Sequence, residues 1–269
     1  MSIAERLRMV SAREGSPNQA LQLNTWLLRR LRVDSTDSPY FDLGNIRLYY
    51  RPERAGGDDA EALRGALLVI TEAFIEGPDF FRGEVTVHAG DTVLDLGGNL
   101  GTSAILFSDI VGRTGQVYSL EPVFHRVLRR NMRANDIGNV EVIPSAVGSK
   151  TGVAEFTVTD FGLDSRRTSP SFGDSSGSLS VPMTTIDEFV DARHLTHVDF
   201  IKLDVEGSEE DALLGARRTL ERYRPKLTVA SYHTDRAGEP QHPKLVALLH
   251  ECGYETLEVD DERIYAWPE

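Results

Sequence analysis

The sequence predicts an α/β protein whose core is a doubly wound, mostly parallel sheet, preceded by an N-terminal helical cap. From residue 91 onward, short β-branched runs alternate with helical patterns. Strands separated by helices of about 10 to 15 residues are typical of parallel βαβ units. The strands are nearly continuous apolar runs, which indicates a sheet covered on both faces. A glycine-rich turn follows the first of these strands.

The elements are expected in a regular order along the chain. We expect strands at 92–96, 116–120, 140–143, 198–203 and 226–230, helices at 103–111, 123–135, 209–222 and 243–252, and terminal strands at 255–259 and 263–267. Two further segments, 153–159 and 179–183, have the alternation of half-exposed strands that can pair. Between them, residues 164–178 form a long polar loop. Such loops are functional or disordered, and we expect this one to close over the site.

Residues 1–82 are expected to cap a domain formed by residues 83–269. One apolar helical face runs from Leu21 to Leu31, a second helix is expected at 59–76, and a strand at 45–51. This segment is too small for a dependable core of its own, so its apolar faces must be buried on the α/β domain or on another subunit. A homodimer through the segment therefore stays open.

Composition excludes several classes of protein. The 269 residues include 42 acidic and 29 basic residues, which gives a formal net charge of −13. This charge repels phosphates, so neither nucleic acid nor a membrane surface is expected as a partner. No apolar run approaches the roughly 18 residues that span a bilayer, and no signal peptide is recognised. With Cys252 as the lone cysteine, we expect an unexported cytoplasmic protein.

The glycine turn indicates the ligand. In the segment 91–101 a buried strand ends at Asp95 and runs into Gly97, Asn99 and Gly101 before a helix. A nicotinamide dinucleotide would need a glycine where this chain has Leu96. A carboxylate beside the turn instead suits a ligand with an ammonium group, such as S-adenosylmethionine. Glu121 ends the next strand, where an acid can accept both ribose hydroxyls.

Further candidates follow the other strands. Ser145 and Ala146 are small enough for a purine to lie against. Asp204 ends the fourth strand at the edge where ligands bind, while His233 follows the fifth strand on the same edge. Ser208 and Asp211 are spaced as a helix-capping pair. A capped helix start accounts for the acids Glu209 and Glu210 in its first turn. It does not account for Asp204 or Glu206.

These motifs resemble the FkbM family of S-adenosylmethionine-dependent methyltransferases. The likeness spans about residues 85–258 and rests on the segments 93–101, 120–122, 185–189 and 200–209. It implies a Rossmann-like, seven-stranded sheet with an antiparallel last strand. It also implies methyl transfer to a hydroxyl of a small molecule such as a secondary metabolite, a sugar or a nucleoside-like acceptor. Carried over by position, the methionine end would contact Asp95, Gly97, Asn99 and Gly101, the ribose Glu121, and the adenine edge Ser145 and Ala146, with Asp204 also beside the cofactor.

An alcohol acceptor must lose its proton during methyl transfer, so a base is needed. His233 and Asp204 are the candidates, and Asp204 could orient His233 or accept the proton itself. We expect no metal, although Asp204, Glu206 and His233 could instead hold Mg²⁺. Two other functions stay open: a non-catalytic sensor of an adenosine ligand on the same fold, and an NAD-dependent oxidoreductase, which Leu96 disfavours.

Overall fold

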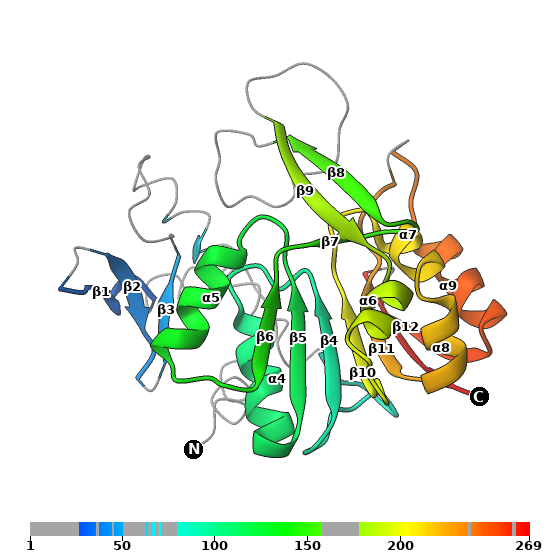
Figure 1. Ribbon diagram of the computed structural model, residues 1–269, viewed down its shortest axis with the longest axis horizontal. Helices are drawn as coiled ribbons and strands as arrows, with labels where there is room; N and C mark the ends of the chain where they lie inside the picture. The colour runs from blue at the N-terminus through cyan, green and yellow to red at the C-terminus, as the bar shows by residue number, and fades with distance from the viewer. Residues whose placement is uncertain are drawn as a thin grey trace.

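The computed structural model describes residues 27–35, 38–44, 46–50, 63, 66, 67, 70, 80–157, 178–235, 238–259 and 262–269. Its centre is a seven-stranded sheet with the order β12-β13-β11-β10-β4-β5-β6 (Figure 1). The strands are β4 (Thr92–Leu96), β5 (Gln116–Leu120), β6 (Val140–Ile143), β10 (Phe200–Leu203), β11 (Lys226–Ala230), β12 (Tyr254–Val259) and β13 (Arg263–Pro268). From β6 to β11 all neighbours are parallel, whereas β13 is antiparallel to both of its neighbours. The predicted doubly wound sheet with an antiparallel last strand is confirmed.

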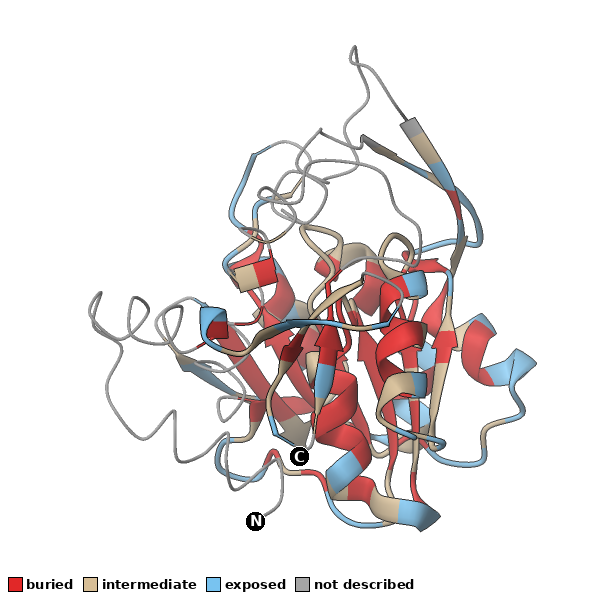
Figure 2. Cartoon of the chain, turned by 90° about the vertical axis from the view of Figure 1, so that its left-hand side faces the viewer, coloured by how far each residue is buried: buried red, intermediate tan, exposed pale blue. Residues whose placement is uncertain are grey.

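Helices cover both faces of this sheet. Val93 of β4 packs in one cluster with Phe107 of α4 (Thr102–Val111), and α5 (His125–Ala134) shares a neighbouring cluster with α4. Leu94, the next residue of β4, packs in the opposite cluster, to which α6 (Ile186–Ala192), α7 (Glu209–Leu214), α8 (Arg217–Tyr223) and α9 (His242–Glu251) contribute. Figure 2 shows the strands and the inner helix faces as buried. Within the described ranges, no helix combines the length and the apolar composition that crossing a bilayer requires.

The helix expected at 209–222 is two helices, α7 and α8, divided at Gly215. A Cβ on Gly215 would lie 2.2 Å from the backbone oxygen of Gly148. The backbone oxygen of Gly215 also accepts a hydrogen bond from the N–H of Asp187 at 2.9 Å. The helical periodicity continues on both sides of Gly215, so the sequence does not predict this break. The break is required only by the tertiary contact between Gly215 and Gly148.

A small sheet, β7-β9-β8, lies beyond the carboxyl ends of the main strands (Figure 1). It consists of β7 (Ala146–Val147), β8 (Gly152–Thr157) and β9 (Ser178–Thr184). The predicted pairing is confirmed, since β8 and β9 are antiparallel, with Phe156 opposite Leu179. Residues 158–177, which hold nearly all of the predicted lid, lie outside the described residues.

The described part of residues 1–82 packs beside α5. Its strands are β1 (Leu31–Val33), β2 (Pro39–Asp42) and β3 (Arg47–Tyr49). Asn131 of α5 accepts from the N–H of Tyr49 at 2.7 Å and donates to its carbonyl oxygen at 2.9 Å, as a neighbouring strand would. Phe41 and Leu48 share a core cluster with α4 and α5. Most of the two helices expected here lies outside the described residues, and Leu31, expected in the first, belongs to β1.

Candidate active site

A pocket opens at the carboxyl ends of β4, β5 and β10, the edge at which ligands bind in open α/β sheets. Its space, including the part open to solvent, is about 1250 Å³. Six predicted residues line it: Gly97, Asn99, Glu121, Ser145, Ala146 and Asp204. Three do not: Asp95, His233 and Gly101, which caps α4 with φ 93°.

The turn after β4 needs glycine for close packing within the protein. Gly97 has φ 83°, and a Cβ on it would lie 1.8 Å from the backbone oxygen of Asp204. A Cβ on Gly98 would lie 2.1 Å from Ser119 Oγ and 2.7 Å from Leu128 Cδ1. The turn therefore lies directly against β10 and α5, and this contact holds its backbone at the pocket.

A row of polar side chains lies beneath the turn. Strand register places Lys202 opposite Asp95 and Asp95 opposite Ser119, so the three side chains share one face of the sheet. The hydroxyls of Ser119 and Ser103 donate to the two oxygens of Asp95 at 2.7 and 2.9 Å. Lys202 Nζ is 3.7 Å from Asp95 Oδ1 and donates to the carbonyl oxygen of Gly97 at 2.7 Å.

This row changes the role expected for Asp95. Its side chain is 0% exposed and does not reach the pocket. Three neighbouring side chains already satisfy the carboxylate, so Asp95 anchors the turn from below. Asp95 therefore does not make the expected direct contact with a ligand ammonium group.

Glu121 closes the loop after β5. Its Oε1 accepts from the N–H groups of Val123 and Phe124 at 2.8 and 2.9 Å, and its Oε2 accepts from the N–H of Asn99 at 2.9 Å. A carboxylate offers about four lone-pair sites, so acceptor capacity remains on Oε2 for a ligand. Burial raises the pKa of Glu121, although these three N–H groups and the charge of Lys202 act in the opposite direction.

Ser145, Ala146 and Asn99 complete this end of the pocket. The Ser145 hydroxyl lies 2.9 Å from the Ala146 carbonyl oxygen and 3.1 Å from that of Pro182, so its proton is used within the protein. Asn99 differs, because its Oδ1 is buried without a hydrogen-bond partner in the described part of the chain. Asn99 thus offers the pocket a free acceptor.

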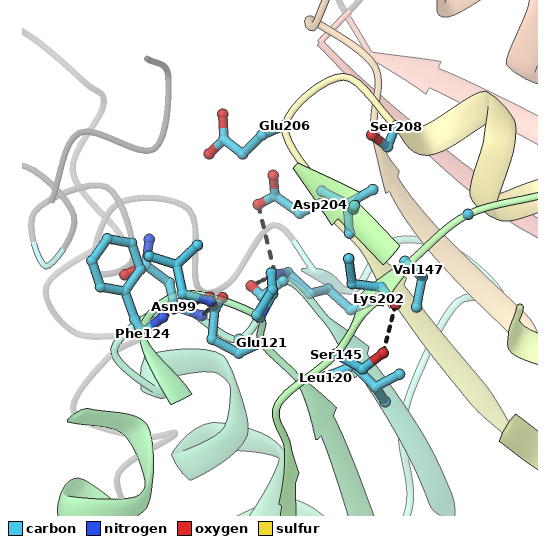
Figure 3. Close-up of a pocket in the computed structure, with 18 of the residues that line it drawn as sticks. Asn99, Leu120, Glu121, Phe124, Ser145, Val147, Lys202, Asp204, Glu206 and Ser208 are labelled. Atoms are coloured by element: carbon cyan, nitrogen blue, oxygen red, sulfur yellow. Dashed lines mark hydrogen bonds and ion pairs between the residues drawn. The ribbon is translucent and has the colours of Figure 1, made fainter. Parts of the chain in front are cut away.

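Two carboxylates, Asp204 and Glu206, lie at the other end of the pocket. Figure 3 shows both on the same side of the loop that follows β10. Burial acts to raise the pKa of Asp204, but the charges of Lys202, His233 and Arg263 outweigh it and lower the pKa. Asp204 is therefore ionised at neutral pH.

Glu209 holds the loop that carries these acids. Its fully buried carboxylate accepts from the N–H groups of Val205 and Gly207 at 2.9 and 3.0 Å. The expected capping by Ser208 is wrong, since Ser208 precedes α7 but makes no side-chain capping bond. A third partner of Glu209 is the side-chain amide of Gln241, which donates to Oε2 at 2.9 Å.

His233 lies behind Asp204 and Glu206. Its Nδ1 is 2.9 Å from Glu209 Oε1, its Nε2 is 3.4 Å from Glu206 Oε2, and its side chain is 10% exposed. Burial disfavours the imidazolium, but the neighbouring carboxylates of Glu206, Glu209 and Asp204 raise the pKa of His233 to about 10. The upward direction agrees with pairing to a carboxylate. A ring that is protonated at neutral pH cannot accept a proton from an alcohol.

Sequence reasoning gave no role to Lys202 and only a capping role to Glu209. The signal for Lys202 was present, since a lysine within an apolar strand is almost never fully buried unless it is paired. Glu209 gave no such signal, because an acid in the first turn of a helix is ordinary.

One family model and several solved structures are similar to this chain. The model of the methyltransferase FkbM domain matches residues 95–256. A solved FkbM methyltransferase from Methylobacillus flagellatus is 18% identical with a TM-score of 0.46, and the alignment covers 93% of this chain but 59% of that protein. Fibrillarin from Aeropyrum pernix, solved with natively bound S-adenosyl-L-methionine, is 20% identical with a TM-score of 0.42, covering 88% of this chain and 92% of that one. No curated protein matches the chain.

The family match extends from Asp95 at the end of β4 to Thr256 in β12. It includes the turn, Glu121 and the loop after β10, which line the pocket, and also His233 beside that loop. Because the match covers more than half of the 269 residues, this chain belongs to the FkbM methyltransferase family.

Proposed function

We propose that this protein transfers the methyl group of S-adenosylmethionine to a hydroxyl group of a small molecule. The observation that carries the proposal is a single pocket that joins the turn at 97–99 and Glu121 at one end to Asp204 and Glu206 at the other. The first end matches a cofactor with ammonium and hydroxyl donors. The second end matches an acceptor that must lose a proton.

The free acceptor atoms at the first end fit this cofactor. Asn99 Oδ1 lacks a partner within the described residues, and it can accept from the ammonium group. Glu121 Oε2 has one hydrogen bond and can accept from a ribose hydroxyl. Ser145, whose proton is used internally, keeps lone pairs for an amino group such as that of adenine. The backbone at Gly97 is held by Lys202, so these atoms are positioned before binding.

The pocket combines apolar walls with charge. Phe124, Phe156 and Met183 line the pocket together with Asp204. An acceptor with an apolar body and a hydroxyl directed toward Asp204 satisfies both features. A secondary metabolite of this kind is the proposed substrate class. We place the reaction in the reducing cytoplasm, because Cys252 is the lone cysteine of the chain.

When bound, S-adenosylmethionine supplies an electrophilic methyl group on a good sulfonium leaving group. The protein must hold the nucleophile within about 3–3.5 Å of the methyl carbon and must allow its proton to be removed. Asp204 is ionised and faces the pocket, whereas His233 lies behind it and is protonated in this arrangement. Of the two expected bases, Asp204 is the one placed to act directly.

Calorimetry with Glu121→Gln tests the cofactor end. Losing a charged hydrogen-bond partner costs about 1.5–3 kcal/mol, so affinity for S-adenosylmethionine should fall about 10- to 150-fold. Glu251→Gln, at a carboxylate that is 60% exposed, is the matched control. Equal affinity of Glu121→Gln and wild type, with circular dichroism showing a folded protein, would exclude the assignment.

Turnover tests the reaction itself. The protein, radiolabelled cofactor and metabolite mixtures should give S-adenosylhomocysteine and a labelled product whose new methyl carbon has the NMR shift of an ether. Binding without turnover of any mixture would favour the sensor. Fluorescence of bound NADH would favour the oxidoreductase.

A further inference from the structure

We infer that Asp204, Glu206 and His233 bind a divalent cation beside the methyl acceptor. One oxygen of each carboxylate and a ring nitrogen of His233 lie within 4.8 Å of one another. Cation–ligand distances of about 2.0–2.2 Å place ligand atoms about 3 to 4.2 Å apart. Small side-chain rotations therefore bring the cluster to binding geometry, and Asp204 and Glu206 already face the pocket.

His233 supplies the observation that points to a ligand. Its Nε2 is buried and has no hydrogen-bond partner within the described residues, although the side chain is only 10% exposed. This nitrogen is directed at the cluster, 3.4 Å from Glu206 Oε2. A bare lone pair facing a carboxylate is repulsive, so the atom requires a proton or a cation between it and Glu206.

Glu209 gives the imidazole the orientation of a metal ligand. His233 Nδ1 is 2.9 Å from Glu209 Oε1, which keeps a proton on Nδ1, so a cation that replaces the Nε2 proton meets a lone pair directed at the cluster. Histidines that bind metals almost always donate their other ring N–H to a carboxylate, a carbonyl or a water. Glu209 is itself fixed by the N–H groups of Val205 and Gly207 and by Gln241. The ring is thus aimed by a rigid, buried partner.

The donor set selects the kind of cation. Mg²⁺ prefers oxygen ligands, whereas imidazole nitrogen suits transition metals, and di-manganese carboxylate proteins combine glutamate with histidine ligands. The carboxylates of Asp204, Glu206 and Glu209 also outnumber the neighbouring ammonium of Lys202, so the local field favours a dication. We therefore assign the site to Mn²⁺ or a similar transition-metal ion in preference to Mg²⁺.

The consequence for catalysis rests on the proposed function. An acceptor hydroxyl bound at an open position of the cation becomes more acidic and releases its proton to water. Its oxygen then forms the bond to the methyl carbon while the carbon–sulfur bond breaks, and that electron pair stays on sulfur. Asp204 holds the cation in this scheme and does not itself take the proton.

The test is a calorimetric titration of chelator-treated, dialysed protein with MnCl₂, without S-adenosylmethionine. One Mn²⁺ should bind per chain, and MgCl₂ should bind at least about tenfold more weakly. Glu206→Gln and His233→Gln should each weaken Mn²⁺ binding at least tenfold, and Glu209→Gln about 10- to 100-fold. Mn²⁺ should raise the unfolding temperature of wild type but not that of Glu206→Gln. The presence of an unfolding transition in Glu206→Gln also shows that this variant is folded.

Asp211→Asn is the matched control, because Asp211 lines the same pocket outside the cluster. It should leave Mn²⁺ affinity nearly unchanged. Absence of Mn²⁺ binding to wild type, or an equal loss in Asp211→Asn and Glu206→Gln, would overturn the inference and leave Asp204 as the direct proton acceptor. Glu121→Gln should keep full Mn²⁺ affinity. Mn²⁺ binding without methyl transfer would count against the proposed function and not against the site.

Discussion

Replacing Lys202 with methionine should destabilise the protein and weaken cofactor binding together. Lys202 is 4% exposed, and its Nζ lies 3.7 Å from both Asp95 and Asp204. At an effective dielectric constant of about 20, each attraction is about 4 kcal/mol before desolvation is subtracted. Methionine fills a similar volume but leaves the fully buried Asp95 with hydroxyl donors only. Breaking a buried pair by removing one partner costs about 3–5 kcal/mol.

The assay is urea denaturation of Lys202→Met and wild type, with thermal unfolding as a second readout. About 2–4 °C per kcal/mol is expected for a chain of this size, so the unfolding temperature should fall by about 6–20 °C. Affinity for S-adenosylmethionine should fall as well, because Lys202 no longer holds the carbonyl of Gly97.

Two further variants make the argument refutable. Arg217→Met removes an ion pair whose partners are 52% and 60% exposed, so it should cost less than about 1 kcal/mol. Asp95→Asn added to Lys202→Met removes the uncompensated charge and should restore part of the stability. A loss below about 1 kcal/mol for Lys202→Met would show that the buried row does not depend on its cation.

Two other outcomes can be measured on the same instruments. Gly97→Ala should cost more than about 3 kcal/mol or prevent folding, because its Cβ would meet a backbone oxygen at 1.8 Å. Gly98→Ala should cost less, because its Cβ would meet side-chain atoms of Ser119 and Leu128, although it would disturb the hydrogen bond of Ser119 to Asp95. Equal losses would contradict this reading of the turn. Glu206→Gly should change the free energy of unfolding by less than about 1 kcal/mol, because relief of the left-handed backbone conformation at φ 56° offsets the loss of the ion pair with His233. The affinity for Mn²⁺ should nevertheless fall at least tenfold. A large loss of stability would indicate that Glu206 serves the fold.

The parallel strands could be predicted from sequence with high accuracy. The bounds of β4, β5, β6 and β11 coincide with the expected ranges, because each is a short, largely apolar run bounded by turn residues. The division of 209–222 at Gly215 could not be predicted, since only a contact with the distant Gly148 requires it.

The sequence predicted where the candidate site lies better than it predicted what each residue does there. Glu121 and Asp204 directly follow β5 and β10, the parallel strands on either side of β4, so topology alone brought them to one edge of the sheet. The bonds of Asp95 could not be read from the sequence, because they depend on which side chains the register places opposite it. The raised pKa of His233 depends likewise on the carboxylates of Glu206 and Glu209, which a loop brings to it.

The two halves of the pocket are therefore fixed by different physical means. Register places Lys202 of β10 against Asp95 of β4, beneath the turn, so the cofactor end follows from the sheet itself. Glu206 and His233 lie beyond the strand ends, where register has no influence. Glu209 ties that loop and that ring together through its buried carboxylate. A change at Glu209 should therefore disturb the acceptor end while the turn and Glu121 keep their geometry, so acceptor chemistry can vary on a constant cofactor platform.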